Sequence, residues 1–290
     1  MTPVRVVFDS NIFDVDNFES LENSPLRHLF TTRRVVPVYG SVFIEETLRA
    51  YGTVGKRDFL VTRWLPFIVA TCECICNDFN VIFHEELVRG RGPHARRLMS
   101  RKDYERFKEC LPRIPLDGTW RAWHASKLER DTEDGKRAAQ REISKDIRAE
   151  VADWKKAVGY QPSKHGLPNF ARYVRSEIDQ AGRTFISKLI KARDLDAIAD
   201  RWIRNKSFYP YFTEFVHDML YEKYYAMTKS NAPLDRNAQA DLDVMAHLLQ
   251  ADVLVSNEKG FLRTAFDDLW KPRGKVLMTG PAFLKYLGMF

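Results

Sequence analysis

Apolar positions near the start of the chain form two short runs, and each run is followed by a segment with helical spacing. Residues 4–8 (VRVVF) and 35–39 (VVPVY) are almost wholly apolar, which predicts buried strands. Residues 18–32 and 41–51 read as amphipathic helices, and Ser41 is of a type that caps helix N-termini. This alternation predicts an α/β fold.

The same alternation returns near the end of the chain. Residues 252–256 and 275–278 predict two further strands, and residues 240–250 and 260–266 predict the helices that precede them. A terminal helix follows. Alternating helices and strands imply a parallel sheet, whose functional site lies at the carboxyl ends of the strands near a reversal of strand order.

Between these two α/β segments, residues 56–230 show long amphipathic helical patterns and no convincing pair of strands. Residues 118–158 are dense in Lys, Arg, Glu and Ala. We find no internal repeat, low-complexity tract or Gly/Ser linker. We therefore predict a discontinuous core, residues 1–55 and 231–290, with a large all-helical insertion packed on it.

Composition favours a globular chain. Apolar residues make up 44% of the 290 residues and aromatic residues 12%, enough to form a core. No apolar run reaches the roughly 18 residues of a membrane span, and the amino terminus lacks the layout of a signal peptide. We expect a soluble, cytoplasmic protein without a membrane partner.

Three of the four cysteines are crowded together, as Cys72, Cys74 and Cys76. Zinc sites usually separate paired cysteine ligands by two residues, whereas these are separated by one and lie in an apolar stretch. Buried, reduced cysteines fit this pattern better than a zinc site or a disulfide framework.

Positive charge is concentrated in the middle of the chain. Residues 101–206 contain 25 Lys and Arg against 17 Asp and Glu, whereas the rest of the chain carries a net charge of −1. A localised basic region attracts polyanions, although a solvated helical face is the ordinary alternative. The candidate contacts to a nucleic-acid backbone are Arg89, Arg91, Arg96, Arg97, Arg101, Lys102 and Arg106.

Acidic residues stand at the predicted strand ends. They are Asp9 after the first strand, Glu45 and Glu46 in the helix after the second, Asp241 and Asp243 opening the helix before the third, and Glu258 after the third. Clustered carboxylates repel one another, so such a cluster is usually neutralised by a cation. Oxygen ligands select Mg²⁺ or Mn²⁺, and these ions support phosphodiester hydrolysis.

These residues resemble the PIN-domain ribonucleases. The resemblance rests on VVFDSNIF, SVFIEETLRAY and DLDVMAHLLQADVLVSNEKGF, which frame about 140 residues of core. It implies that Asp9, Glu46 and Asp241 are metal ligands, with Glu45 and Asp243 in reserve. It also implies that Asn11 or Ser256 orients a ligand or a water.

The fourth position of the family pattern departs from expectation. Ser256 stands where the family has Thr or Ser, but the expected Asp is Glu258, preceded by Asn257. Glu is longer by one methylene and could hold a metal through a water, so the departure bears on whether a second ion binds.

Each acidic residue also has an ordinary structural interpretation. Asp9 can belong to a turn, Glu45 and Glu46 to a solvated helix face, Asp241 to a helix N-terminus and Glu258 to a loop. Their joint order along the chain favours the site. Among the scattered histidines, His247 alone lies near the predicted strand ends, and a core or surface position fits it better than catalysis.

The sequence therefore predicts a metal-dependent endoribonuclease that uses Mg²⁺ or Mn²⁺. The preference for RNA is implied by the family resemblance alone. Two alternatives remain: a catalytically silent PIN fold that binds RNA or serves assembly, and a toxin or phage-defence nuclease held by a protein partner. An inhibitor protein or a second copy of the chain is a further candidate partner.

Overall fold

The structure is a computed structural model of the chain. It describes residues 2–13, 15–40, 43, 57–72, 74–77, 79–110, 146, 149–153, 155–157, 170–228 and 238–289. The chain divides into two compact units. The first, called the sheet unit, comprises Met1–Ile82, Arg96–His124 and Ala240–Phe290, and the second, called the helical unit, comprises Phe83–Ala95 and Ala125–Gln239.

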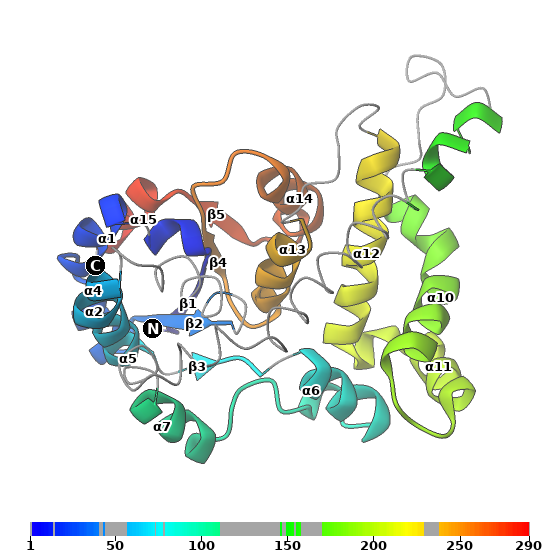
Figure 1. The fold of residues 1–290 in the computed structure, drawn as a ribbon, viewed down its shortest axis with the longest axis horizontal. Coiled ribbons are helices and arrows are strands. Elements are labelled where there is room, and N and C mark those ends of the chain that lie inside the picture. Colours follow the sequence, from blue (N-terminus) through cyan, green and yellow to red (C-terminus); the bar gives the residue numbers. More distant parts are fainter. Residues whose placement is uncertain are drawn as a thin grey trace. The chain divides into compact units, whose positions relative to one another are not determined.

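A five-stranded sheet organises the sheet unit (Figure 1). Its strands are β1 (Val4–Phe8), β2 (Val35–Tyr39), β3 (Cys74–Ile75), β4 (Val253–Val255) and β5 (Val276–Met278). Their order is β3-β2-β1-β4-β5, and each neighbouring pair is parallel. The chain moves outward from β1 through β2 and β3, then restarts on the other side of β1. The order therefore reverses between β1 and β4.

Helices and helical turns cover the sheet. In the sheet unit they are η1 (Ser10–Phe13), α1 (Val15–Glu22), α2 (Leu26–Thr31), α4 (Arg57–Phe59), η2 (Leu60–Trp64), α5 (Leu65–Thr71), α6 (Phe79–Phe83), α7 (Arg101–Cys110), α13 (Ala238–Ala246), η6 (His247–Leu249), α14 (Phe261–Leu269), η7 (Lys271–Arg273) and α15 (Gly280–Leu287). Figure 1 shows α13 and α14 on the side of the sheet away from α1, α2 and α5. The α/β architecture expected from the sequence is confirmed.

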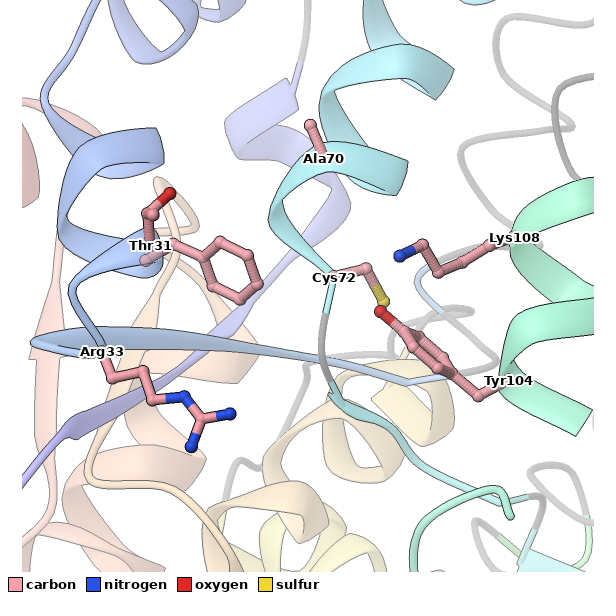
Figure 2. A pocket seen from close by; sticks show the side chains of 7 residues that line it. Thr31, Arg33, Ala70, Cys72, Tyr104 and Lys108 are labelled. Atoms are coloured by element: carbon pink, nitrogen blue, oxygen red, sulfur yellow. The ribbon is translucent and has the colours of Figure 1, made fainter. Parts of the chain in front are cut away.

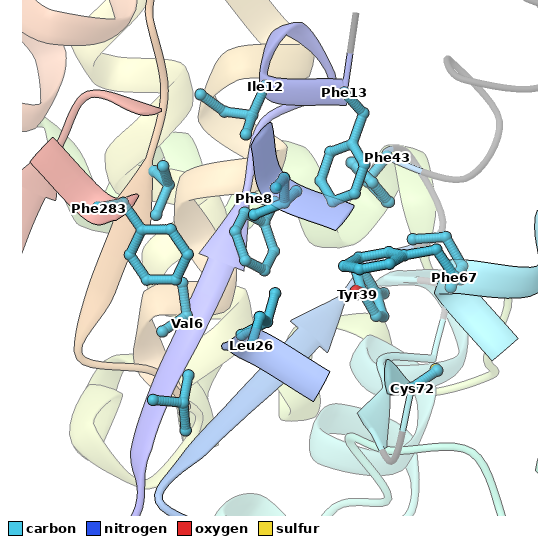
Figure 3. Packing of buried hydrophobic residues seen from close by; sticks show 14 of the residues in the cluster. Val6, Phe8, Ile12, Phe13, Leu26, Tyr39, Phe43, Phe67, Cys72 and Phe283 are labelled. Carbon is cyan, nitrogen blue, oxygen red and sulfur yellow. The ribbon is translucent and has the colours of Figure 1, made fainter. Parts of the chain in front are cut away.

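Aromatic side chains dominate the core on the α1, α2 and α5 side of the sheet (Figure 3). The Phe8 ring stacks on Tyr39 with centroids 6.1 Å apart, and Phe13 meets Phe43 edge to face at 5.0 Å. Side chains on a strand alternate between faces, so Val6 and Phe8 enter this core while Val7 faces the other side. The buried apolar runs noted in the sequence thus become two-sided strands.

Two expectations about local structure are wrong. Residues 18–32 form two helices rather than one, because Pro25 lacks the amide hydrogen needed inside a helix and disfavours helical geometry before it. Residues 56–230 are not all helical, since β3 pairs with β2 through Val38 and Cys74. A strand of two residues is too short to show alternation.

The helical unit has three long helices in its described part. Its elements are η3 (His84–Val88), η4 (Gly92–His94), α10 (Phe170–Leu189), α11 (Leu195–Arg204), η5 (Lys206–Phe208) and α12 (Pro210–Thr228). Trp202 of α11 is fully buried against Phe212 of α12, with ring centroids 5.4 Å apart. Among the described helices, none has the length and apolar character to cross a membrane.

Candidate functional site

The reversal of strand order brings two sequence-distant segments together. Asp9 follows β1 and Ser256 follows β4, and these strands are neighbours through Phe8 and Val255. The amide of Asp9 donates to the carbonyl of Val255 at 3.0 Å, which extends the pairing by one residue. The crevice beyond such a reversal is the usual ligand site of an open parallel sheet.

Asp9 is held by hydrogen bonds from both segments. Its Oδ2 accepts from Ser256 Oγ at 2.6 Å and from Asn11 Nδ2 at 2.7 Å. Asn11 Oδ1 in turn accepts from the amide of Asn257 at 3.0 Å. Asn257 Oδ1 accepts from the amide of Gly280 at 2.9 Å, so the network reaches the start of α15. Two predicted side chains, Ser256 and Asn11, thus fix the Asp9 carboxylate, and the amides of Asn257 and Gly280 extend the network behind them.

The second oxygen of Asp9, Oδ1, has fewer side-chain hydrogen bonds from described residues than Oδ2. Among side chains in the described part of the chain, only the Ser10 hydroxyl reaches Oδ1, at 3.5 Å. Asp9 itself is only 7% exposed, and Ser256 is 1% exposed. The carboxylate is therefore buried, and its side-chain hydrogen bonds from described residues are concentrated on Oδ2.

Glu258 lies beside this network in the loop after β4. Its amide donates to Ser256 Oγ at 3.0 Å, the same hydroxyl that donates to Asp9. Its Oε1 accepts from the amides of Lys259 and Gly260, at 3.0 and 2.7 Å. One carboxylate oxygen of Glu258 thus stabilises its own loop, and the other accepts no hydrogen bond from the described residues.

Electrostatics disfavour a negative charge at Asp9. Burial raises the pKa of Asp9 above its ordinary value, and the negative charge of Glu258 raises it further. Hydrogen bonding by Ser256 and by the backbone of Asn11 and Ser10 opposes that rise. Within the described ranges, no Lys or Arg forms an ion pair with Asp9 or Glu258. Two neighbouring carboxylates without an ion-pair partner among the described Lys and Arg residues suit a hard metal ion.

The other predicted ligands are only partly placed. Asp241 and Asp243 lie in α13, half-buried, directly before β4. In the described part of the chain, no three His, Cys, Asp or Glu side chains form a group that could hold one ion. Asp241 therefore does not complete such a group with Asp9 and Glu258. Glu45 and Glu46 lie outside the described residues.

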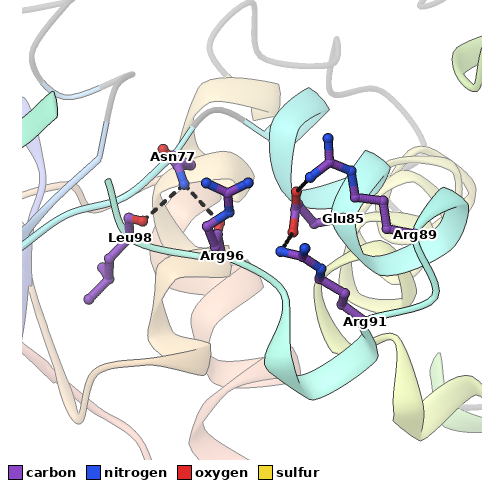
Figure 4. Close-up of polar contacts among 6 residues, drawn as sticks. All are labelled: Asn77, Glu85, Arg89, Arg91, Arg96 and Leu98. Carbon is purple, nitrogen blue, oxygen red and sulfur yellow. Dashed lines mark hydrogen bonds and ion pairs between the residues drawn. The ribbon is translucent and has the colours of Figure 1, made fainter. Parts of the chain in front are cut away.

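The predicted basic contact stretch is divided between the two units. Arg89 and Arg91 belong to the helical unit, where their guanidinium groups pair with the buried Glu85 at 2.7 and 2.6 Å (Figure 4). The remaining five belong to the sheet unit: Arg96, Arg97, Arg101, Lys102 and Arg106. Two of the seven residues proposed to contact phosphate, Arg89 and Arg91, are therefore already paired with a carboxylate.

In the sheet unit, Asn77 positions the start of the remaining basic segment. Its Nδ2 donates to the carbonyls of Arg96 and Leu98, at 2.8 and 3.0 Å (Figure 4). Cys76 forms an antiparallel bridge with Leu98, so this segment runs along the outer edge of β3. The backbone of Arg96 is thereby held beside the sheet, while its side chain is exposed.

His247, in η6, is a core residue, one of the two positions, core or surface, that the sequence favoured over catalysis. It is 2% exposed, and neither ring nitrogen has a hydrogen-bond partner among the described residues. Its ring stacks on Phe79 at 5.3 Å, and burial lowers its pKa to about 4.

Sequence reasoning did not identify the roles of Ser10 and Gly280 in the Asp9 network, because neither residue type signals such a contact.

Comparison with known proteins adds no relative. Neither a protein-family model, nor a curated protein, nor a solved structure matches the chain. The function must therefore be inferred from the site itself, a buried carboxylate fixed at the reversal point of a parallel sheet.

Proposed function

We propose that the protein is a metal-dependent nuclease of the PIN-domain type that hydrolyses RNA phosphodiester bonds with Mg²⁺ or Mn²⁺. The observation that carries the proposal is Asp9: a buried carboxylate at the strand-order reversal, beside Glu258, held at Oδ2 by Ser256 and Asn11 and without an ion-pair partner among the described residues.

The placement of Asp9 costs stability. Burial of a charged carboxylate without an ion-pair partner is unfavourable, and a second carboxylate nearby adds repulsion. A neutral residue at position 9 would avoid both penalties. Groups with raised pKa values and specific charged neighbours at a crevice are typical of functional sites.

Asp9 and Glu258 would hold the metal. Asp241 and Glu46, or their neighbours Asp243 and Glu45, remain the proposed additional ligands, although Asp241 forms no three-residue group with Asp9 and Glu258 in the structure, and Glu46 lies outside the described residues. A bound Mg²⁺ or Mn²⁺ lowers the pKa of a water and stabilises charge on the leaving oxygen. Ser256 and Asn11 would act by holding Oδ2 of Asp9, which fixes the orientation of the carboxylate.

The direct test is cleavage of labelled single-stranded RNA and DNA with Mn²⁺, Mg²⁺ or EDTA. The variants are Asp9→Asn, Asp241→Asn and, as the matched control, Asp252→Asn. Asp252 is exposed at the amino end of β4, where its Oδ2 accepts from the amide of Arg5. We expect metal-dependent RNA cleavage that is lost in the first two variants and retained in the control. Equal cleavage by the wild type and Asp9→Asn would overturn the proposal.

One observation favours a second candidate function, a catalytically silent RNA-binding or assembly module. Glu258 replaces the Asp of the family pattern, and its Oε1 is occupied by the amides of Lys259 and Gly260. Such a module would bind RNA in EDTA, with an affinity that falls as salt rises, and would cut nothing with either metal.

A further inference from the structure

A pocket of about 280 Å³ opens on the sheet unit away from the Asp9 site. Among the residues that line it, Phe30 lies in the last turn of α2, Arg33 precedes β2, Cys72 precedes β3, and Tyr104 and Lys108 belong to α7 (Figure 2). Arg33 and Cys72 both stand before their strands, whereas Asp9 and Ser256 follow theirs. Because the strands are parallel, the pocket lies at the amino ends of the strands, opposite the carboxyl ends where Asp9 and Ser256 lie.

The pocket combines two cations with two aromatic rings. No Asp or Glu lines it, in the part of the chain that the structure describes. Lys108 Nζ lies over the Tyr104 ring, 5.1 Å from its centroid, and forms no ion pair with a described carboxylate. Figure 2 shows Lys108 and Arg33 approaching the pocket from opposite sides. The lining therefore favours an anion that also carries an aromatic group.

Arg33 has an unusual backbone conformation. Its φ of 54° lies in the left-handed region, and it is the one non-glycine residue with positive φ among those described. Its amide donates to the carbonyl of Phe30, and the amide of Arg34 donates to the carbonyl of Leu29. Arg33 therefore follows Thr32, the C-cap residue of α2, in the position that usually holds glycine. An L-residue there costs roughly 1 kcal/mol. We therefore expect the Arg33 side chain to have a role that glycine could not fill.

We propose that this pocket binds one nucleoside phosphate, either a free nucleotide or the phosphorylated end of a nucleic-acid strand. The phosphate would lie between Arg33 and Lys108, since guanidinium and ammonium groups form strong charge-assisted hydrogen bonds with phosphate oxygens. The base would stack against Tyr104 or Phe30, as bases do on aromatic side chains. The volume is near the lower end of the roughly 300–1,000 Å³ of ligand pockets, which suits one nucleotide.

This binding site does not depend on the proposed nuclease activity, because it lies at the amino ends of the strands and the Asp9 site lies at their carboxyl ends. Binding is therefore measured in EDTA, by calorimetry and by fluorescence anisotropy. The probes are AMP, adenosine, inorganic phosphate and a short single-stranded RNA with either a 5′-phosphate or a 5′-hydroxyl. Saturable binding of AMP would identify a free nucleotide, and binding of the 5′-phosphorylated RNA alone would identify a strand end.

Arg33→Gly separates binding from folding. Glycine relieves the left-handed strain, so the melting temperature should be unchanged or higher, while affinity for the bound probe should fall at least about tenfold with the loss of one charged contact. Lys108→Gln should weaken binding similarly. The control is Lys285→Gln, a lysine of α15 outside the pocket, which should bind as the wild type does.

Two results would overturn the proposal. One is that none of the phosphorylated probes binds the wild type. The other is that Arg33→Gly and Lys108→Gln bind them as tightly as Lys285→Gln does, since the phosphate would then lie elsewhere.

Discussion

The buried His247 makes a defined prediction about stability and pH. Its pKa falls from an ordinary 6.5 to about 4 because the ring is removed from water, and neither nitrogen has a hydrogen-bond partner in the described part of the chain. The folded sheet unit therefore holds the neutral imidazole, whereas the unfolded chain takes up a proton as the pH falls below about 6.5. Stability is present above that pH and is lost as the pH falls toward 4.

The size of the effect follows from the pKa difference. One pKa unit corresponds to about 1.4 kcal/mol, so His247 alone should remove about 2 kcal/mol of stability between pH 7 and pH 5, and about 3 kcal/mol by pH 4. The perturbation is His247→Leu, which keeps an apolar side chain against Phe79 but cannot titrate. His28→Leu on α2 is the control, because His28 is exposed.

The assay is urea unfolding at pH 7, 6 and 5, with hydrogen exchange of the β2 and β4 amides as a readout specific to the sheet unit. The wild type should lose about 2 kcal/mol relative to His247→Leu over this range, and His28→Leu should follow the wild type. Parallel pH profiles for the wild type and His247→Leu would refute the reasoning, because they would show that this imidazole protonates equally well in the folded state.

Two further predictions concern the helical unit. A methyl group at Gly182 of α10 would overlap the buried indole of Trp202, so Gly182→Ala should lower the urea midpoint. Alanine gains about 1 kcal/mol in helix propensity. Overpacking costs about 1–3 kcal/mol, and an overlap this close belongs at the upper end of that range. An unchanged or raised midpoint would contradict that packing. Glu86, 0% exposed, accepts from the amides of Tyr211 and Phe212 at 3.1 and 2.9 Å, so Glu86→Gln should cost about 1.5–3 kcal/mol in urea unfolding. Its control, Asp196→Asn in the exposed first turn of α11, should change stability by less than about 0.5 kcal/mol.

Much of the sheet could be predicted from local patterns, because strands β1, β2, β4 and β5 are apolar runs bounded by polar residues. The meeting of Asp9 with Ser256 also follows from sequence, once both are placed after strands of one parallel sheet. The edge strand β3 could not be found, since two residues carry no periodicity. The break in the predicted helix 18–32 was signalled by Pro25.

The incomplete part of the candidate site depends on tertiary packing. The position of Asp241 relative to Asp9 is set by how α13 lies against the sheet, and residue spacing does not determine that angle. The pairing of Arg91 with Glu85 arises from a turn after the helical segment, although the spacing of Glu85 and Arg89 is that of a helical ion pair. A run of basic residues therefore does not by itself define a phosphate-binding surface.

The most direct test of the central claim is the melting temperature of metal-stripped protein as Mn²⁺ is added, compared among the wild type, Asp9→Asn and Asp252→Asn. The wild type and Asp252→Asn should gain stability with saturation behaviour, by about 2.7 kcal/mol when the ion is at a hundred times its Kd. Asp9→Asn should gain none, and in EDTA it should be at least as stable as the wild type, because a buried charge is removed while the acceptor for Ser256 and Asn11 remains. An equal Mn²⁺-dependent gain in Asp9→Asn would show that Asp9 does not hold the ion and would contradict the account.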